Sequence, residues 1–156
     1  MPNSERDSAS TVQAAAPATS AGQALAPLSV REKLALVAEI LAAYVVVRRR
    51  MMRENDIRVI VAQVRGAGAG ERRCNRPVAR RLARAVTRTL TPLPTDNRCL
   101  ARSLVLDRLL ERRSLQSVVV VAVRSEPDFA AHAWVEHDGL AVLPPGSSSF
   151  QRLIEL

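Results

Sequence analysis

Apolar side chains recur every three or four residues between Leu34 and Val45, which is the spacing of one face of a helix. Ser29 and Glu32 precede this run at the spacing of a capping box, in which each side chain bonds to the other residue's backbone N–H. We therefore expect a helix from Ser29 to about Arg50. Its apolar face comprises Leu34, Val37, Ala38, Leu41, Tyr44 and Val45.

Two more helices follow in the pattern. Residues 76–90 carry apolar positions on one face and arginines mostly on the other, with Pro77 in the first turn, where a missing N–H costs nothing. A third helix is expected to span about 95–113. The apolar run at 55–65 suits a strand or a helix equally, because it is too short for its period to decide.

The pattern changes to that of strands in the C-terminal third. A continuous valine run at 117–124 is typical of a central strand that is covered on both faces. Further strands are expected at 130–137 and 140–143, and Asp138-Gly139 between them is a strong signal for a two-residue hairpin loop. The last segment, 150–156, suits a strand or a helical turn.

These elements divide the chain into four parts. Residues 1–27 are rich in Ala, Ser, Thr, Pro and Gln and are expected to be a disordered tail. Residues 28–65 form an N-terminal helical region. Residues 66–74 open with alternating glycines, lack the spacing of a nucleotide-binding loop, and are expected to be a flexible linker. Residues 75–156 form an α+β core, in which a helix packs on a small antiparallel sheet.

The charge adds a preference for anionic partners. The net charge is +8, and arginine supplies all the positive side chains except Lys33. Arginine holds carboxylates and phosphates with a planar fork, so nucleic acid, an acidic protein or peptide, and an anionic membrane all fit. Aromatic residues make up only 3% of the chain and no nucleic-acid motif occurs, which ranks nucleic-acid binding last.

The longest apolar run, 34–47, contains Glu39 and is shorter than the roughly 20 residues that a membrane-spanning helix needs. We therefore expect no stable membrane insertion. No secretory signal is visible, and Cys74 and Cys99 form neither a disulfide framework nor a zinc spacing. A cytoplasmic location with reduced cysteines is expected, and so is the absence of a metal or cofactor.

Cys99 is the first candidate for chemistry. It is expected in the first turn of the third helix, where free N–H groups and the helix dipole stabilise a thiolate, and Arg98 and Arg102 add positive charge. The alternative is a small buried apolar residue, which is common for a free cysteine. Cys74 lies in a polar segment and has no such placement.

His132 gives Cys99 a candidate partner. It lies mid-strand between small residues, and a cysteine at a helix N-terminus facing a strand histidine is the arrangement of a thiolate–imidazolium pair. The alternative is a histidine in the core whose ring nitrogens both have hydrogen-bond partners. His137 is five residues further on, so strand alternation puts it on the opposite face. We interpret it as a solvated hairpin residue, which argues against a shared metal site.

The sequence leaves open which group would orient the His132 ring. A two-residue hairpin loop places His132 opposite Pro145, with Pro144 adjacent, and neither proline side chain accepts a hydrogen bond. Glu136 is too far, because it lies about 13 Å along the strand. The remaining candidates are Asp96, Asp128, a backbone carbonyl, a water, Ser147, Ser148 and Ser149.

Two segments together resemble a known family. They read CLARSL at 99–104 and FAAHAWVE at 129–136. They resemble the lasso-peptide leader peptidase family, which is the transglutaminase-like half of the lasso biosynthetic B protein, here in stand-alone form. The close resemblance covers about residues 75–140, and 28–65 is similar to the family's N-terminal helices more loosely. It implies a papain/transglutaminase-like cysteine peptidase fold.

The resemblance also implies an activity and partners. The activity is that of a cysteine-type hydrolase, which removes the leader from a ribosomally made precursor during lasso peptide maturation. Cys99 maps to the nucleophile, His132 to the general base, and the family's acidic third residue to Pro144. The implied partners are the precursor peptide, a small leader-binding recognition protein and an asparagine-synthetase-like cyclase.

The missing acidic residue at position 144 motivates an alternative function. A catalytically impaired scaffold would dock the recognition protein and the cyclase and present the precursor without cleaving it. The reactivity of Cys99 distinguishes the two functions, because a scaffold needs no activated thiol.

Overall fold

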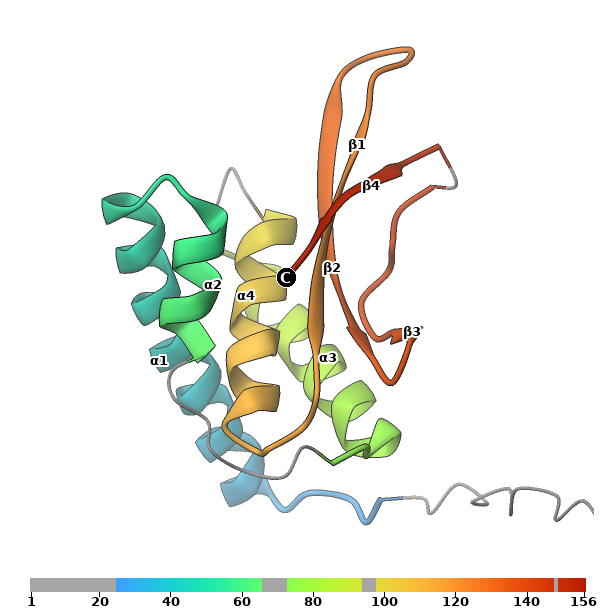
Figure 1. The fold of residues 1–156 in the computed structure, drawn as a ribbon. Coiled ribbons are helices and arrows are strands. Elements are labelled where there is room, and N and C mark those ends of the chain that lie inside the picture. The colour runs from blue at the N-terminus through green and yellow to red at the C-terminus, as the bar shows by residue number, and fades with distance from the viewer. Residues whose placement is uncertain (1–24, 66–72, 94–97, 148) are drawn as a thin grey trace, which may run out of the picture.

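The computed structural model describes residues 25–65, 73–93, 98–147 and 149–156, and their elements form a helical layer and a sheet (Figure 1). The helices are α1 (Val30–Arg53), α2 (Ile57–Arg65), α3 (Arg76–Leu90) and α4 (Arg98–Glu111), and the strands are β1 (Val118–Arg124), β2 (Ala130–His137), β3 (Leu140–Ala141) and β4 (Gln151–Glu155). The helices lie on one side of the sheet, and the chain that follows β3 runs along the other side. This is the α+β arrangement that the order of elements predicts.

Local signals set the ends of α1 and α3. The Ser29 N–H donates to Glu32 Oε2 at 2.8 Å, and the Glu32 N–H donates to Ser29 Oγ at 3.3 Å, which completes the predicted capping box. These hydrogen bonds hold the pKa of Glu32 below its usual range. α1 continues to Arg53, slightly past its predicted end. α3 covers the predicted 76–90, and the Asn75 side chain caps it.

The ambiguous stretch at 55–65 forms helix α2 and not a strand. Its buried residues are Ile60, Val61 and Val64, which follow helical spacing. α2 packs against α1 and α4, and its buried residues join the same core cluster as theirs. Tertiary packing therefore decides the structure of a segment whose local pattern fits both.

The sheet has the strand order β3-β2-β1-β4, and neighbouring strands are antiparallel. β1 lies between β2 and β4, as its valine run predicts, and the last segment of the chain forms a strand. Asp138 and Gly139 have φ values of 53° and 68°, as a tight two-residue hairpin requires. His137 pairs with Leu140, as the predicted two-residue loop at Asp138-Gly139 requires.

β3 is shorter than predicted, and this changes the surroundings of His132. The N–H groups of Val142 and Leu143 both point at the carbonyl of Val135, at 2.9 and 3.5 Å, so the regular ladder ends there. The pairing predicted opposite His132 does not form. The carbonyl of Pro144 lies beside the His132 ring instead.

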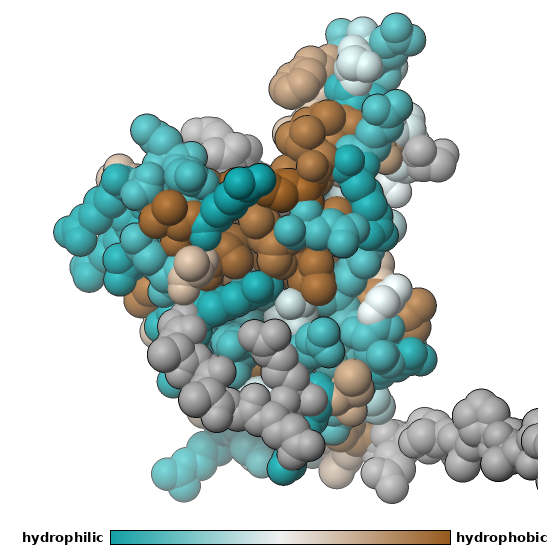
Figure 2. Space-filling model, viewed as in Figure 1, coloured by the Kyte–Doolittle hydropathy of each residue, from teal (hydrophilic) through white to brown (hydrophobic). Residues whose placement is uncertain are grey.

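The core lies between the helices and the sheet, and α4 supplies much of it. Four leucines of α4 are fully buried: Leu104, Leu106, Leu109 and Leu110. On the face drawn in Figure 2, apolar side chains gather between the helices and the strands, whereas the outer surface of the helices is mostly hydrophilic. In the part of the chain that the structure describes, no helix is long and apolar enough to cross a membrane.

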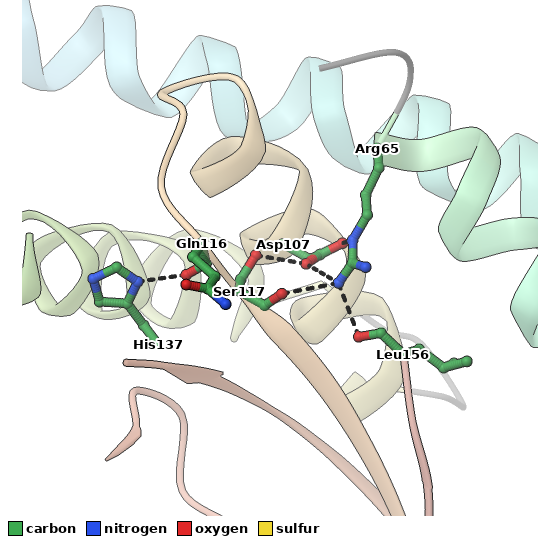
Figure 3. A network of polar contacts seen from close by, with 6 residues as sticks. All are labelled: Arg65, Asp107, Gln116, Ser117, His137 and Leu156. Atoms are coloured by element: carbon green, nitrogen blue, oxygen red, sulfur yellow. Dashed lines mark hydrogen bonds and ion pairs between the residues drawn. The ribbon is translucent and has the colours of Figure 1, made fainter. Parts of the chain in front are cut away.

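A buried carboxylate ties the helices to the sheet (Figure 3). Asp107 of α4 has no exposed surface, and it accepts two hydrogen bonds from Arg65 and one from the Ser117 hydroxyl, at 2.7 to 3.0 Å. The Arg65 guanidinium also donates to the backbone oxygens of Ser117 and Leu156. Because these bonds compensate the buried charge, the network holds α2, α4 and two ends of the sheet together.

His137 is buried, so its interpretation as a solvated hairpin residue is wrong. The residue is only 1% exposed. Its Nδ1–H donates to the Gln116 carbonyl (Figure 3), and its Nε2 accepts the Asn75 N–H at 3.0 Å. Because Asn75 caps α3, the N-terminus of that helix covers the end of the hairpin. This contact joins positions far apart in the sequence, which explains why alternation along the strand did not predict it.

The apolar face expected for α1 is not the face that the fold buries. The buried residues of α1 are Ile40, Ala43 and Val47. Four members of the predicted face are exposed: Leu34, Val37, Leu41 and Val45. α1 therefore carries two apolar faces, and the described chain uses one of them.

Several predicted segments lie outside the described residues. They include the tail up to residue 24, residues 66–72 of the linker, and the predicted start of the third helix at 94–97. At the described end of the linker, the Arg73 N–H donates to the Ser114 carbonyl at 2.8 Å.

Candidate active site

Cys99 lies in the first described turn of α4 and is partly buried. Arg98 and Arg102 lie on the same helix, and Arg102 donates to the Thr91 hydroxyl at 3.2 Å. Among the described residues, neither of these guanidiniums pairs with a carboxylate. The guanidiniums and the N–H groups at the start of the helix give this end of α4 a positive field around the sulfur.

A cleft of about 460 Å³ joins Cys99 to His132. Helices α3 and α4 contribute Thr87 and the Cys99 region, and β2 and the chain after β3 contribute His132, Leu143 and Pro144. No hydrogen bond within the described ranges links Cys99 to His132. Catalytic hydrogen bonds are often long in ligand-free enzymes and tighten when substrate binds. Cys99 and His132 thus line one cleft, and the contacts of the His132 ring are made with Pro144, Trp134 and Phe150.

The hydrogen bond of His132 fixes which ring nitrogen carries the proton. Its Nε2 lies 3.0 Å from the carbonyl oxygen of Pro144. A carbonyl oxygen can only accept, so Nε2 is the donor and the neutral ring leaves Nδ1 unprotonated. Nδ1 makes no hydrogen bond with the described residues, so it is the ring nitrogen that can accept a proton.

Packing also fixes the plane of the His132 ring. Trp134 stacks with it at a centroid distance of 6.1 Å, and Phe150 lies at 5.6 Å with a tilt of 44°. Gly146 closes the same space, because a Cβ there would lie 3.1 Å from Cδ2 of His132 and 3.1 Å from the Phe150 ring. Gly146 also has a φ of 81°, a conformation that favours glycine. The rings of Trp134 and Phe150 and the backbone of Gly146 therefore hold the imidazole in place.

Other groups considered for orienting His132 are engaged elsewhere or lie outside the described residues. Glu136 accepts a hydrogen bond from Trp134 Nε1 and pairs with Arg152 at 2.6 Å. The hydrogen bond that Arg152 donates to Glu155, together with the charge of Glu136, raises the pKa of Arg152. The hydroxyls of Ser147 and Ser149 bond to each other at 2.7 Å. Asp96 and Ser148 lie outside the described residues, and Asp128 makes no hydrogen bond with those that are described.

Sequence reasoning missed Gly146 and Phe150 as parts of this site. Both lie near the end of the chain, and their contacts with His132 depend on how the segment after β3 folds back. The one available signal was the Pro-Pro-Gly run, which ends at Gly146 and indicates a turn. Cys74, in contrast, is exposed and lies outside the cleft. The described residues contain no group of three His, Cys, Asp or Glu side chains that could hold a metal ion.

The fold and the cleft define an α+β domain in which a cysteine on a helix and a histidine on a strand line one cleft. The chain belongs to the transglutaminase-like superfamily, because the sequence model of that superfamily matches residues 40–155. This superfamily includes cysteine peptidases and transglutaminases. The match begins within α1, so it includes part of the N-terminal helical region. Searches of curated proteins and of solved structures gave no match.

Proposed function

We propose that this chain is a cysteine peptidase that removes the leader from a lasso precursor peptide. The observation that carries the proposal is the single cleft that contains both Cys99 and His132. Two features of the sequence support it: membership of the transglutaminase-like superfamily, and the combined CLARSL and FAAHAWVE segments that resemble the lasso leader peptidases.

The proposed reaction uses Cys99 as nucleophile and His132 as the proton carrier. Nδ1 of His132 takes the Cys99 thiol proton, and the sulfur attacks the carbonyl carbon at the leader–core junction. N–H groups at the start of α4 would stabilise the oxyanion. Nδ1 then returns the proton to the core amine as the C–N bond breaks, leaving the leader as a thioester on Cys99. Water activated by His132 hydrolyses this thioester and restores the thiol.

The Pro144 carbonyl would take over the orienting role of the family's acidic residue. It bonds to Nε2–H at 3.0 Å and so fixes the tautomer that leaves Nδ1 as the base. A carbonyl offers direction but no full negative charge for the imidazolium. We therefore expect catalysis that is slower than with a carboxylate but still dependent on His132.

The proposed partners follow from the same function. They are the precursor, a leader-binding recognition protein and an asparagine-synthetase-like cyclase that closes the macrolactam. The net charge of +8 suits acidic segments on these partners. We expect the recognition protein to be required, because the described helices and strands all belong to the fold around the cleft and none forms a separate leader-binding unit.

The experiment is leader cleavage, followed by mass spectrometry, with precursor and recognition protein present. Cys99→Ala should abolish the product, because the attacking sulfur is gone, whereas Cys74→Ser, which removes the exposed cysteine, should leave the rate nearly unchanged. Omitting the recognition protein should greatly slow the reaction at micromolar precursor. Equal losses in two folded cysteine variants would reject Cys99 as the nucleophile.

A catalytically silent scaffold is the second candidate function. It is favoured by the proline at position 144 and by the absence of a hydrogen bond between Cys99 and His132 in the described structure. Alkylation by iodoacetamide separates the two functions. A peptidase should show faster alkylation at Cys99 than at the more exposed Cys74, and a scaffold should show no such excess.

A further inference from the structure

Helix α1 presents an apolar stripe that nothing in the described chain covers. Its members, which we call the α1 stripe, are Val30, Leu34, Val37, Leu41 and Val45, and their exposed fractions lie between 38% and 72%. The residues that α1 buries lie on a different face of the helix. Isolated exposed apolar residues are ordinary, but a contiguous row of them marks an interaction surface.

The spacing of the stripe indicates what kind of surface it fits. Its members follow one another at intervals of four, three, four and four residues. Intervals of three and four residues are typical of a helix face that packs along a second helix. The stripe carries no Trp, Tyr or Phe, which are typical anchors of helices that lie in a membrane interface. The geometry therefore favours a helix of a protein partner over a lipid surface.

The charges beside the stripe indicate the sign of the charge that the partner carries. Arg31, Arg48 and Arg49 lie along or beside it, and none of them forms an ion pair within the described ranges. The carboxylates of α1 are used elsewhere, since Glu32 caps the helix and Glu39 pairs with Arg113 at 2.6 Å. The surface is thus apolar and cationic, and an acidic partner complements it.

A second copy of the chain fits this surface poorly. Two antiparallel α1 helices would bring the Arg31 end of one copy against the Arg48 and Arg49 end of the other, and two parallel helices would align identical arginines. The net charge of +8 on each copy adds to the repulsion.

We propose that the α1 stripe is the docking surface for an acidic amphipathic helix of a partner protein. Under the proposed function, on which this assignment of the partner rests, that protein is the recognition protein that delivers the leader. The stripe then serves binding alone, since none of its residues lines the cleft with Cys99 and His132.

The test measures binding of the purified recognition protein to the full chain by titration calorimetry. Leu34→Glu and Leu41→Glu should each weaken binding about tenfold or more, because each removes an apolar anchor and adds a repelling charge. The matched control is Leu153→Glu on β4, where Leu153 is 67% exposed against 65% for Leu34. It should leave the Kd within about twofold of that of the unmodified chain. Arg48→Glu should weaken binding several-fold and reduce its dependence on salt.

Three results would overturn the docking proposal. They are an unchanged Kd in Leu34→Glu, an equal loss in Leu153→Glu, and no binding by the unmodified chain. Two further arms test other occupants of the stripe. The docking proposal would also be rejected if the chain self-associates in sedimentation and Leu34→Glu abolishes that association. It would be rejected likewise if the chain binds vesicles of phosphatidylcholine with anionic phosphatidylglycerol and Leu34→Glu abolishes that binding.

A parallel cleavage assay separates failure of docking from failure of the proposed function. If docking holds, Leu34→Glu raises KM for the complex of precursor and recognition protein and leaves both kcat and Cys99 alkylation unchanged. If the unmodified chain binds through the stripe but never cleaves, the peptidase function fails and docking stands. If Leu34→Glu cleaves with an unchanged KM, docking fails and the peptidase stands.

Discussion

His132 and His137 lie on the same strand, five residues apart, and the structure uses them in opposite ways. His137 is 1% exposed, and both of its ring nitrogens are bonded to backbone groups near the helices. His132 has one nitrogen bonded to the Pro144 carbonyl and opens onto the cleft with Cys99. A histidine with both nitrogens satisfied holds structure, whereas one with a fixed tautomer and a free nitrogen can move protons. The difference comes from what covers each face of β2.

Removing His132 should have the largest effect on activity. His132→Ala should slow leader cleavage by about 10³-fold, because the thiol loses its base and the leaving amine loses its acid. The free energy of unfolding should fall by less than in His137→Ala, since the His132 ring is only partly buried. Cleavage rate and urea unfolding check the two parts. A variant that keeps the wild-type rate would mean that no Cys–His catalysis occurs.

Removing His137 should damage stability and leave the chemistry intact. His137→Ala should lower the free energy of unfolding by roughly 2–4 kcal/mol, because the Asn75 N–H and the Gln116 carbonyl lose their partner in a buried place. Urea unfolding measures the loss, and cleavage per folded molecule should stay near wild type. The contrast between the histidines fails if His132→Ala proves the more destabilising change.

A smaller effect should follow from unclamping the His132 ring. Gly146→Ala puts a Cβ 3.1 Å from the ring and should lower kcat about tenfold, with KM unchanged, because the imidazole is displaced from its working position. Gly139→Ala is the matched control. Gly139 also has a positive φ, but its Cβ would meet nothing within 4 Å. Both variants share the backbone strain, so equal kcat values for the two would show that the clamp does not position His132.

Much of the fold is local and could be read from the sequence. Pro77 marks the first turn of α3, and the Asp138-Gly139 loop marks the turn between β2 and β3. The predicted helix at 76–90 and the predicted strand at 130–137 both form. The stretch 55–65 could not be assigned, because only its packing against α1 and α4 selects a helix. The burial of His137 and the exposed face of α1 were missed for the same reason, since both depend on contacts between distant segments.

The sequence pointed to the two central residues of the candidate site more readily than to the groups around them. The sequence singled out Cys99 and His132, and the structure places both in one cleft. A backbone carbonyl was one of several groups left open for orienting the ring, and the Pro144 carbonyl makes that bond. No spacing rule reaches Gly146 and Phe150, because a bulged, non-repeating segment brings them to His132.

The most direct test of the account is covalent labelling of the intact protein. A leader peptide that carries a chloromethyl ketone at its C-terminus would be incubated with the chain and the recognition protein, and the adduct mapped by mass spectrometry. Catalysis by Cys99 and His132 predicts one adduct, on Cys99, that forms much more slowly in His132→Ala. An adduct on Cys74, or labelling of Cys99 at the same rate without His132, would contradict it.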